Sequence, residues 1–259
     1  MLIPIKAGFS APLRLFCFPY AGAGAWAFRK WKSHVIDNVE LYSVQLPGRE
    51  NQLDRAPFTA MPPLMTALAD AIEPMLDRPC VFFGHSLGSL IAFECARELR
   101  RRGAPLPQRM IVSGRRAPQI PREQPFWHTM DDEALAGEVR NLGGTPEGVL
   151  EHPELRAMFL PMLRADFSLN ETYACASEAP LSVPATMLYG RDDATTNRMQ
   201  ALAWREQFAS PVRFVEFEGG HFFVEQCFED VMVQVNAELA TALALTRWPR
   251  PKPSETLAG

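Results

Sequence analysis

Hydrophobic and polar positions along the chain follow two alternating patterns. Short apolar runs, rich in β-branched and aromatic residues and bounded by Gly or Pro, are separated by longer segments with apolar residues at helical spacing. The short runs predict six strands, at residues 14–18, 40–45, 80–83, 109–113, 185–189 and 212–217. Helices are expected over residues 65–76 and after Gly88. This alternation predicts an α/β protein with a mostly parallel central sheet flanked by helices.

Between the fourth and fifth predicted strands, from residue 117 to residue 179, the pattern indicates only helices. Thr129 starts a predicted capping box for a helix that ends at Gly143, and Thr145 and His152 each precede a proline, as N-cap residues often do. The last of these helices carries apolar residues on one side, namely Leu155, Met158, Phe159, Met162, Leu163 and Phe167. An insertion of this kind predicts a lid over a site, although the same side chains are also typical of a closed core.

The chain of 259 residues is near the upper size of a single domain. We therefore expect one core domain, residues 1–116 and 180–246, interrupted by the helical lid at residues 117–179. The remaining residues, 247–259, are proline-rich and polar, and we expect them to form a disordered tail.

Ser86 lies in the five residues Gly84-His85-Ser86-Leu87-Gly88, which match the pattern G-x-S-x-G. In a nucleophile elbow this pattern follows a strand and opens a helix. Residues 81–83 supply the strand, and apolar residues at helical spacing follow Gly88. We therefore predict that Ser86 is a nucleophile exposed at the carboxyl end of the sheet.

A serine nucleophile needs a histidine base, and the base needs a carboxylate that holds its tautomer. His221 follows the last predicted strand, in a loop with paired glycines, and is the predicted base. His85 adjoins Ser86 on the same tight turn, so we expect it to pack beside the elbow. The other three histidines, His34, His128 and His152, are expected to be surface or cap residues.

The carboxylate should come from the turn after the strand at residues 185–189, because the chain order with this elbow is Ser, then Asp or Glu, then His. That turn contains two adjacent candidates, Asp192 and Asp193. Spacing alone does not choose between them.

Two backbone N–H groups are needed to stabilise the oxyanion. One is predicted at Leu87, directly after the nucleophile, and the other at Ala21, in the loop after the first predicted strand. The glycines of this loop, Gly22 and Gly24, could also begin a dinucleotide-binding motif. The third glycine of that motif is missing, so we infer no nucleotide.

Composition narrows the classes of partner. The net charge of −4 gives no overall cationic field for nucleic acid or an anionic membrane. The N-terminus lacks the apolar segment and cleavage site of a leader, and no long apolar run occurs, which predicts a cytoplasmic protein without a membrane span. The cysteines are odd in number and mostly within apolar segments, which indicates reduced, buried thiols. No metal-binding motif is present, so no metal is expected.

Together, these residues resemble the type II thioesterases, the stand-alone editing enzymes of nonribosomal peptide and polyketide synthases. The resemblance covers about residues 12 to 243, and the lid stretch is its most distinctive part. The stretches that carry it are FCFPYAGAGAWAF (16–28), VQLPGRE (44–50), FFGHSLGSLIAFECARELR (82–100), VSGRRAP (112–118), NLGGTPEGVLEHPELRAMFLPMLRADFSLNETY (141–173), YGRDDATTNRMQALAWREQF (189–208) and EGGHFFVEQ (218–226).

The resemblance implies an α/β-hydrolase fold and favours Asp193 as the carboxylate. It implies an acyl thioester substrate on the phosphopantetheine arm of an acyl or peptidyl carrier protein, with no cofactor of the enzyme's own, and we expect a monomer. Met158, Phe159 and Met162 of the lid are expected to shape the substrate pocket. Arg115 and Arg116 are candidates for contact with an acidic carrier surface or with phosphate, or else are ordinary solvated arginines.

Two other functions fit the same residues. One is a different serine hydrolase or acyltransferase, such as a carboxylesterase or a chain-terminating cyclase. The other is a catalytically idle protein that binds carriers, and the complete Ser, His and Asp set argues against it.

Overall fold

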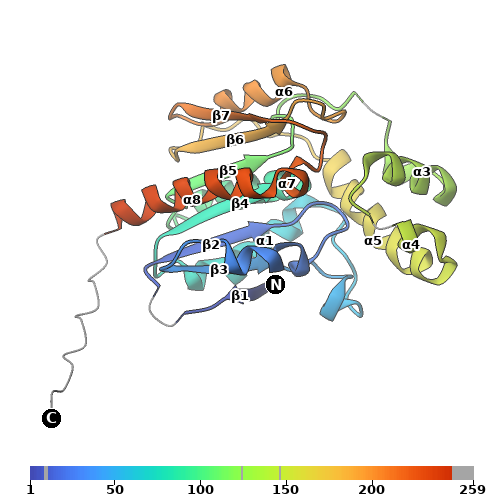
Figure 1. Cartoon of the computed structure of the whole chain (residues 1–259), viewed down its shortest axis with the longest axis horizontal. Coiled ribbons are helices and arrows are strands. Elements are labelled where there is room, and N and C mark those ends of the chain that lie inside the picture. Colours follow the sequence, from blue (N-terminus) through green and yellow to red (C-terminus); the bar gives the residue numbers. More distant parts are fainter. Residues whose placement is uncertain (9–10, 124, 146, 247–259) are drawn as a thin grey trace, which may run out of the picture.

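A seven-stranded sheet forms the centre of the molecule (Figure 1). The computed structural model describes residues 1–8, 11–123, 125–145 and 147–246. The strands are β1 (Leu2–Lys6), β2 (Leu13–Phe18), β3 (Val39–Val44), β4 (Cys80–His85), β5 (Arg109–Ser113), β6 (Ala185–Gly190) and β7 (Val212–Phe217). Their order is β1-β3-β2-β4-β5-β6-β7, and only the pair of β1 with β3 is antiparallel. The predicted mostly parallel sheet is confirmed.

All six predicted strands are present, with ends that differ by at most two residues. The antiparallel edge strand β1 is a seventh strand that was not predicted. Pro4 lies in the middle of this strand, and a proline inside a short apolar run argues against a central strand. Proline is tolerated there because an edge strand pairs on one side only.

Helices cover both faces of the sheet. On one face, α1 (Met61–Ile72) and α2 (Leu87–Arg101) pack against strand residues that include Phe16 and Phe82. On the other face, α8 (Phe228–Leu245) and the 3-10 segment η1 (Ala25–Ser33) pack against Leu15 and Phe83. Figure 1 shows α8 crossing in front of the sheet and α1 behind it. Burial on both faces explains why the central strands are mainly apolar rather than alternating between apolar and polar residues.

Short helices also follow β6 and β7. They are α6 (Arg198–Leu202) with the 3-10 segment η5 (Ala203–Gln207), and α7 (Phe223–Gln226). The turns that precede α6 and α7 carry Asp193 and His221 to the carboxyl end of the sheet.

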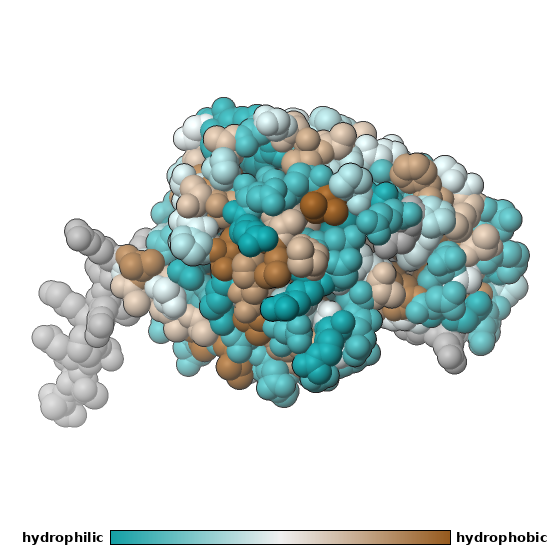
Figure 2. Space-filling model, turned by 90° about the horizontal axis from the view of Figure 1, so that it is seen from above, coloured by the Kyte–Doolittle hydropathy of each residue, from teal (hydrophilic) through white to brown (hydrophobic). Residues whose placement is uncertain are grey.

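The chain between β5 and β6 forms three helices, α3 (Asp132–Leu142), α4 (Glu147–Glu151) and α5 (Pro153–Glu171). We call residues 117–179 the helical insertion. Its helices lie beyond one end of the sheet (Figure 1) and form a separate lobe in the space-filling view (Figure 2). The visible face in Figure 2 is mainly hydrophilic, with small hydrophobic patches.

The N-cap of α3 differs from the prediction. Asp131 caps the helix through its Oδ1, which accepts a hydrogen bond from the Ala134 N–H at 2.8 Å, whereas Thr129 ends the preceding 3-10 turn. A carboxylate two residues later in the sequence therefore takes the role predicted for Thr129. At α5, His152 is the N-cap and Pro153 the first helical residue, as predicted. The predicted cap at Thr145-Pro146 lies partly outside the described residues.

Several other expectations can be compared with the structure. All five cysteines are free, and Cys17, Cys80 and Cys95 are buried, as expected for reduced thiols. Among the described residues, no helix combines the length and apolar character that crossing a bilayer requires. The predicted tail, residues 247–259, lies outside the described part of the chain.

Candidate active site

Ser86 occupies a strained turn between β4 and α2. Its backbone has φ 53° and ψ −120°, in the left-handed half of φ space that residues with a Cβ rarely adopt. The Ser86 N–H donates to the Ser113 carbonyl of β5 at 2.8 Å, which fixes the turn against the neighbouring strand. Such strain persists only where surrounding contacts enforce it, and it is typical of functional sites.

The two glycines of the elbow are required by close packing. A Cβ on Gly84 would overlap the carbonyl of Gly88, and a Cβ on Gly88 would overlap the carbonyl of Phe18 at the end of β2. The first glycine therefore lets the chain reverse, and the second lets α2 approach the oxyanion loop, as we call residues 19–24. The G-x-S-x-G pattern thus has a steric cause here.

The structure brings the three predicted catalytic side chains together. Ser86 Oγ lies 2.9 Å from His221 Nε2, and His221 Nδ1 lies 2.9 Å from Asp193 Oδ2. A carboxylate only accepts hydrogen bonds, so Nδ1 carries the proton and Nε2 accepts from the serine hydroxyl. These residues come from the ends of β4, β6 and β7, and the carboxyl ends of parallel strands share one edge of a sheet.

Asp193 is buried, whereas the adjacent Asp192 is exposed. Thr195 donates two hydrogen bonds to Asp193 Oδ1, from its N–H at 2.8 Å and its hydroxyl at 2.7 Å. Burial alone would raise the pKa of Asp193, but the hydrogen bonds from His221 and Thr195 and the histidine charge outweigh it and lower that pKa. The structure therefore selects Asp193 as the partner of His221. Sequence reasoning missed Thr195, although a hydroxyl two residues after an aspartate in a turn is a recognisable signal.

His85 packs beside the elbow, as expected. Its Nδ1 is 2.9 Å from Ser113 Oγ, and its ring centroid is 5.2 Å from that of His221. Burial, together with the nearby His221, lowers the pKa of His85 to about 3, so the ring is neutral near pH 7. His128, predicted to be a surface or cap residue, instead contacts the buried Glu171 at 2.6 Å.

The two predicted oxyanion donors are the backbone N–H groups of Leu87 and Ala21. Leu87 is the first residue of α2, and an N–H at that position has no partner within the helix. Ala21 lies in the oxyanion loop, which lines the pocket together with Ser86. Within the described part of the chain, the Ala21 N–H has no hydrogen-bond acceptor. Both N–H groups are therefore available to a developing negative charge.

Comparison with known proteins identifies the family. The profile of the thioesterase domain family matches residues 13–239, most of the chain. The protein belongs to the thioesterase domain family. It is a hydrolase that acts on thioesters, and its relatives include type II thioesterases of nonribosomal peptide and polyketide pathways. The resemblance predicted from the sequence and the α/β-hydrolase fold are both confirmed.

Three relatives show the extent of the similarity. The gramicidin S biosynthesis protein GrsT of Aneurinibacillus migulanus is 39% identical over 235 residues, 91% of this chain and 92% of that protein. The RedJ thioesterase from the prodiginine pathway of Streptomyces coelicolor is 38% identical, with a TM-score of 0.84 over 88% of this chain and 91% of RedJ. YbtT, a type II thioesterase from the yersiniabactin pathway, is 33% identical, with a TM-score of 0.82 over 93% of this chain and 99% of YbtT.

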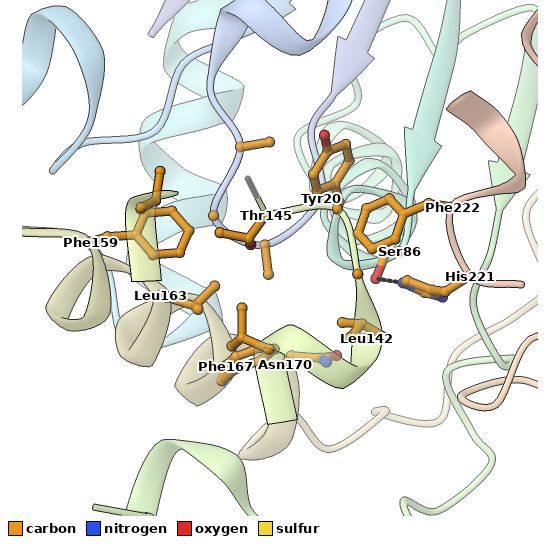
Figure 3. A pocket seen from close by; sticks show the side chains of 17 residues that line it. Tyr20, Ser86, Leu142, Thr145, Phe159, Leu163, Phe167, Asn170, His221 and Phe222 are labelled. Atoms are coloured by element: carbon orange, nitrogen blue, oxygen red, sulfur yellow. Dashed lines mark hydrogen bonds between the residues drawn. The ribbon is translucent and has the colours of Figure 1, made fainter. Parts of the chain in front are cut away.

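The helical insertion of this thioesterase forms one wall of a pocket that reaches Ser86 (Figure 3). In Figure 3, Phe159, Leu163 and Phe167 of α5 face the space opposite Ser86 and His221. The pocket encloses about 690 Å³ including its open mouth. The other lining residues are Tyr20, Ala21, Gly22, Ala23, Val139, Leu142, Gly143, Gly144, Thr145, Val149, Asn170 and Phe222. Its mainly apolar wall suits an acyl chain.

Of the three predicted lid residues, only Phe159 lines this pocket. Met158 is 58% exposed and Met162 is buried, and neither belongs to the pocket lining. Met158 and Met162 therefore do not line the pocket as predicted, because one face of α5 meets the pocket and these residues lie on other sides of the helix. Leu163 and Phe167, which belong to the predicted apolar stripe, take their place.

Arg115 and Arg116 follow β5, as the sequence indicated, but Arg115 is only 5% exposed. Its guanidinium donates from Nη1 to Asn170 of α5, and its carbonyl accepts from Trp204 Nε1 at 2.8 Å. Burial, together with nearby Arg116 and Arg122, lowers the pKa of Arg115 to about 9. Arg115 is therefore not a solvated arginine, and together with Arg116 it lines a small cavity that also contains Ser86 and His221. Arg116 is half-buried and donates to the Ile120 carbonyl at 3.1 Å.

Proposed function

We propose that this thioesterase hydrolyses acyl groups held as thioesters on the phosphopantetheine arms of acyl or peptidyl carrier proteins, and so removes acyl groups that block synthase modules. The observation that carries the proposal is the 2.9 Å contact between Ser86 Oγ and His221 Nε2, beside an apolar pocket in a member of the thioesterase family. The relatives named above belong to gramicidin S, prodiginine and yersiniabactin biosynthesis, which supports a substrate of this class.

The proposed reaction begins with acylation of Ser86. Its hydroxyl proton moves to His221 Nε2 while Oγ attacks the thioester carbonyl carbon, and the oxyanion that forms accepts hydrogen bonds from the Leu87 and Ala21 N–H groups. The carbon–sulfur bond then breaks, His221 Nε2 gives its proton to the sulfur, and the carrier thiol leaves. Thiols ionise near pH 8.5, so the sulfur needs little help from an acid. Asp193 stabilises the imidazolium that exists in between.

Deacylation repeats these steps with water. His221 Nε2 takes a proton from water as the water oxygen attacks the acyl-enzyme carbonyl, and it returns that proton to Ser86 Oγ when the ester bond breaks. The free acid leaves and the enzyme is restored. Every step uses groups of this chain, so the proposal includes no cofactor and no metal of the enzyme's own. The whole site comes from one chain, and we propose a monomer.

The test compares one acyl group in three forms: on a carrier protein, on free pantetheine and as a simple oxygen ester. We expect kcat/KM for the carrier thioester to exceed that of the oxygen ester at least tenfold. Ser86→Ala should lower kcat by roughly 10⁴-fold or more, whereas Ser33→Ala, an exposed serine outside the site, should not. Faster hydrolysis of the oxygen ester would instead indicate a carboxylesterase, and unchanged turnover in Ser86→Ala would overturn the mechanism.

A further inference from the structure

A buried ion pair joins the helical insertion to the core next to the active site. Arg49, in the segment after β3, contacts Asp166 of α5 in a bidentate arrangement, with Nη1 to Oδ2 and Nη2 to Oδ1 both at 2.7 Å. Arg49 is 3% exposed and Asp166 is fully buried. Burying both charges costs a large desolvation energy, so a buried ion pair is weak evidence for stability alone. The other hydrogen bonds of Arg49 and Asp166 indicate a second role for the ion pair.

Both partners of the ion pair also bind the backbone of the oxyanion loop. Asp166 Oδ2 accepts a hydrogen bond from the Gly22 N–H at 2.8 Å, and Arg49 Nη1 donates to the Ala23 carbonyl at 2.9 Å. Gly22 and Ala23 are the two residues that follow Ala21, whose N–H is the proposed oxyanion donor.

The turn itself transmits this restraint to Ala21. The Ala23 N–H donates to the Tyr20 carbonyl at 3.0 Å, and this carbonyl belongs to the same planar peptide group as the Ala21 N–H. Gly22 has φ 80°, a conformation that a glycine adopts without cost but that needs outside contacts to be held in one state. Two contacts from the ion pair therefore restrain one side of the turn, and the direction of the Ala21 N–H depends on them.

The same helix also supplies the acyl pocket. The positions of Phe159 and Leu163 leave little room beside Gly22, where a Cβ would lie 3.0 Å from Phe159 Cζ and 3.1 Å from Leu163 Cδ1. One element, α5, thus contacts both the acyl space and the oxyanion loop. A shift of α5 would change both at once.

We propose that Arg49 and Asp166 are positioning residues that aim the Ala21 N–H at the reacting oxygen, and that they make a working oxyanion hole depend on the position of α5. This inference rests on the proposed Ser86 mechanism. A donor that is aimed in advance stabilises the transition state more than the bound substrate, so its loss lowers kcat rather than raising KM.

The experiment uses Asp166→Asn in the full chain, with Asp132→Asn as the matched control. Asp132 also joins α5 through an ion pair, with Arg164 at 2.7 Å, but the Asp132 side chain is 70% exposed and does not contact the oxyanion loop. For a butyryl carrier thioester we expect Asp166→Asn to lower kcat about 10- to 100-fold, with KM changed less than threefold, since removing a whole oxyanion donor costs about 10²- to 10³-fold. Asp132→Asn should retain kcat within about twofold.

A second measurement distinguishes positioning of the Ala21 N–H from a purely structural role in which the ion pair only supports the helical insertion. Butylboronic acid forms a tetrahedral adduct with an active serine, whereas a carrier with an amide-linked butyryl group binds without reacting. For Asp166→Asn, the affinity for the boronic acid should fall by the same factor as kcat, and the affinity for the amide should stay within threefold. Equal weakening of both ligands, or an unchanged boronic acid affinity, would overturn the inference.

The double variant Arg49→Met/Asp166→Leu covers the case in which Asp166→Asn does not fold. Removing both charges leaves no unpaired buried ion, which is the costly outcome of a single change. The Gly22 N–H still loses its acceptor, so we expect the same loss of kcat and of boronic acid affinity. Full turnover in this folded variant would overturn the inference, whereas a wild-type enzyme that hydrolyses no thioester would count against the proposed function instead.

Discussion

His221 Nδ1 lies 2.9 Å from Asp193 Oδ2, and both side chains are more than nine-tenths buried. The exposed Asp192, one residue earlier, has no such contact within the described residues. Asp193 is therefore the carboxylate that fixes the tautomer of His221 and faces the positive charge that develops on its ring.

We expect Asp193→Asn to lower kcat about 10⁴-fold, because an amide in this position no longer favours the tautomer with Nε2 free to accept the serine proton. Steady-state hydrolysis of a carrier thioester measures the effect. Asp192→Asn is the matched control and should retain activity within about twofold. The opposite result, a mild Asp193→Asn and a crippled Asp192→Asn, would show that a different carboxylate serves His221.

The strained backbone conformation of Ser86 should lower the free energy of unfolding of the protein. With φ at 53°, a Cβ at this residue is strained by roughly 1–3 kcal/mol, whereas glycine avoids the strain but loses roughly 0.5–1 kcal/mol of chain entropy. We expect Ser86→Gly to unfold with a free energy about 1 kcal/mol higher than Ser86→Ala, and both variants to be inactive. Urea denaturation measures the difference, and an alanine variant of equal or greater stability would argue against strain at the elbow.

The buried neutral His85 should make stability depend on pH. Its pKa in the folded protein is about 3, below the roughly 6.5 of an unfolded histidine, so the unfolded chain binds more protons between these values. The free energy of unfolding should therefore fall as pH drops below about 6.5, and His85 should account for about 2 kcal/mol of the loss between pH 7 and pH 5.

Urea denaturation of the wild type and of His85→Gln at the two pH values isolates this contribution. The variant should lose less stability than the wild type on acidification. His34→Gln, at a half-buried position far along the chain from the elbow, is the control and should follow the wild type. Parallel losses in all three proteins would mean that His85 does not carry the effect.

Chain-length preference should depend on one face of α5. Phe159→Ala removes an aromatic ring from the pocket wall, and we expect it to lower kcat/KM for a hexanoyl carrier thioester about tenfold while affecting an acetyl substrate much less. Met158→Ala changes the neighbouring exposed residue and should leave both substrates within about twofold. If Met158→Ala changed the preference as much as Phe159→Ala, the pocket seen in Figure 3 would not be the acyl site.

The sequence predicted much of the fold because its decisive signals are local. The strands β2 to β6 are largely buried and β7 carries β-branched and aromatic residues, so their sequences indicate strands, whereas Pro4 interrupts the edge strand β1. Ser86, His221 and the acidic turn could be placed near one another because strand ends meet at one edge of a parallel sheet. The choice between Asp192 and Asp193 needed coordinates or the family resemblance, since adjacent residues have the same spacing.

Other features depend on contacts between distant segments. Arg49 and Asp166 are 117 residues apart, and neither has a local pattern that indicates burial. Arg115 is buried by Asn170 and Trp204, which follow much later in the chain, so its pair with Arg116 looked like a surface feature. The rotation of α5 that turns Phe159 inward and Met158 outward is likewise set by packing against the core.

The central claim is that Ser86 carries the acyl group during hydrolysis of a carrier thioester, and mass spectrometry of a rapidly quenched reaction tests it most directly. In the presence of butyryl carrier protein, the account predicts a peptide containing Ser86 whose mass is increased by one butyryl group, and no such peptide in Ser86→Ala. Butyryl transfer to another residue, or hydrolysis by Ser86→Ala at the wild-type rate, would contradict it.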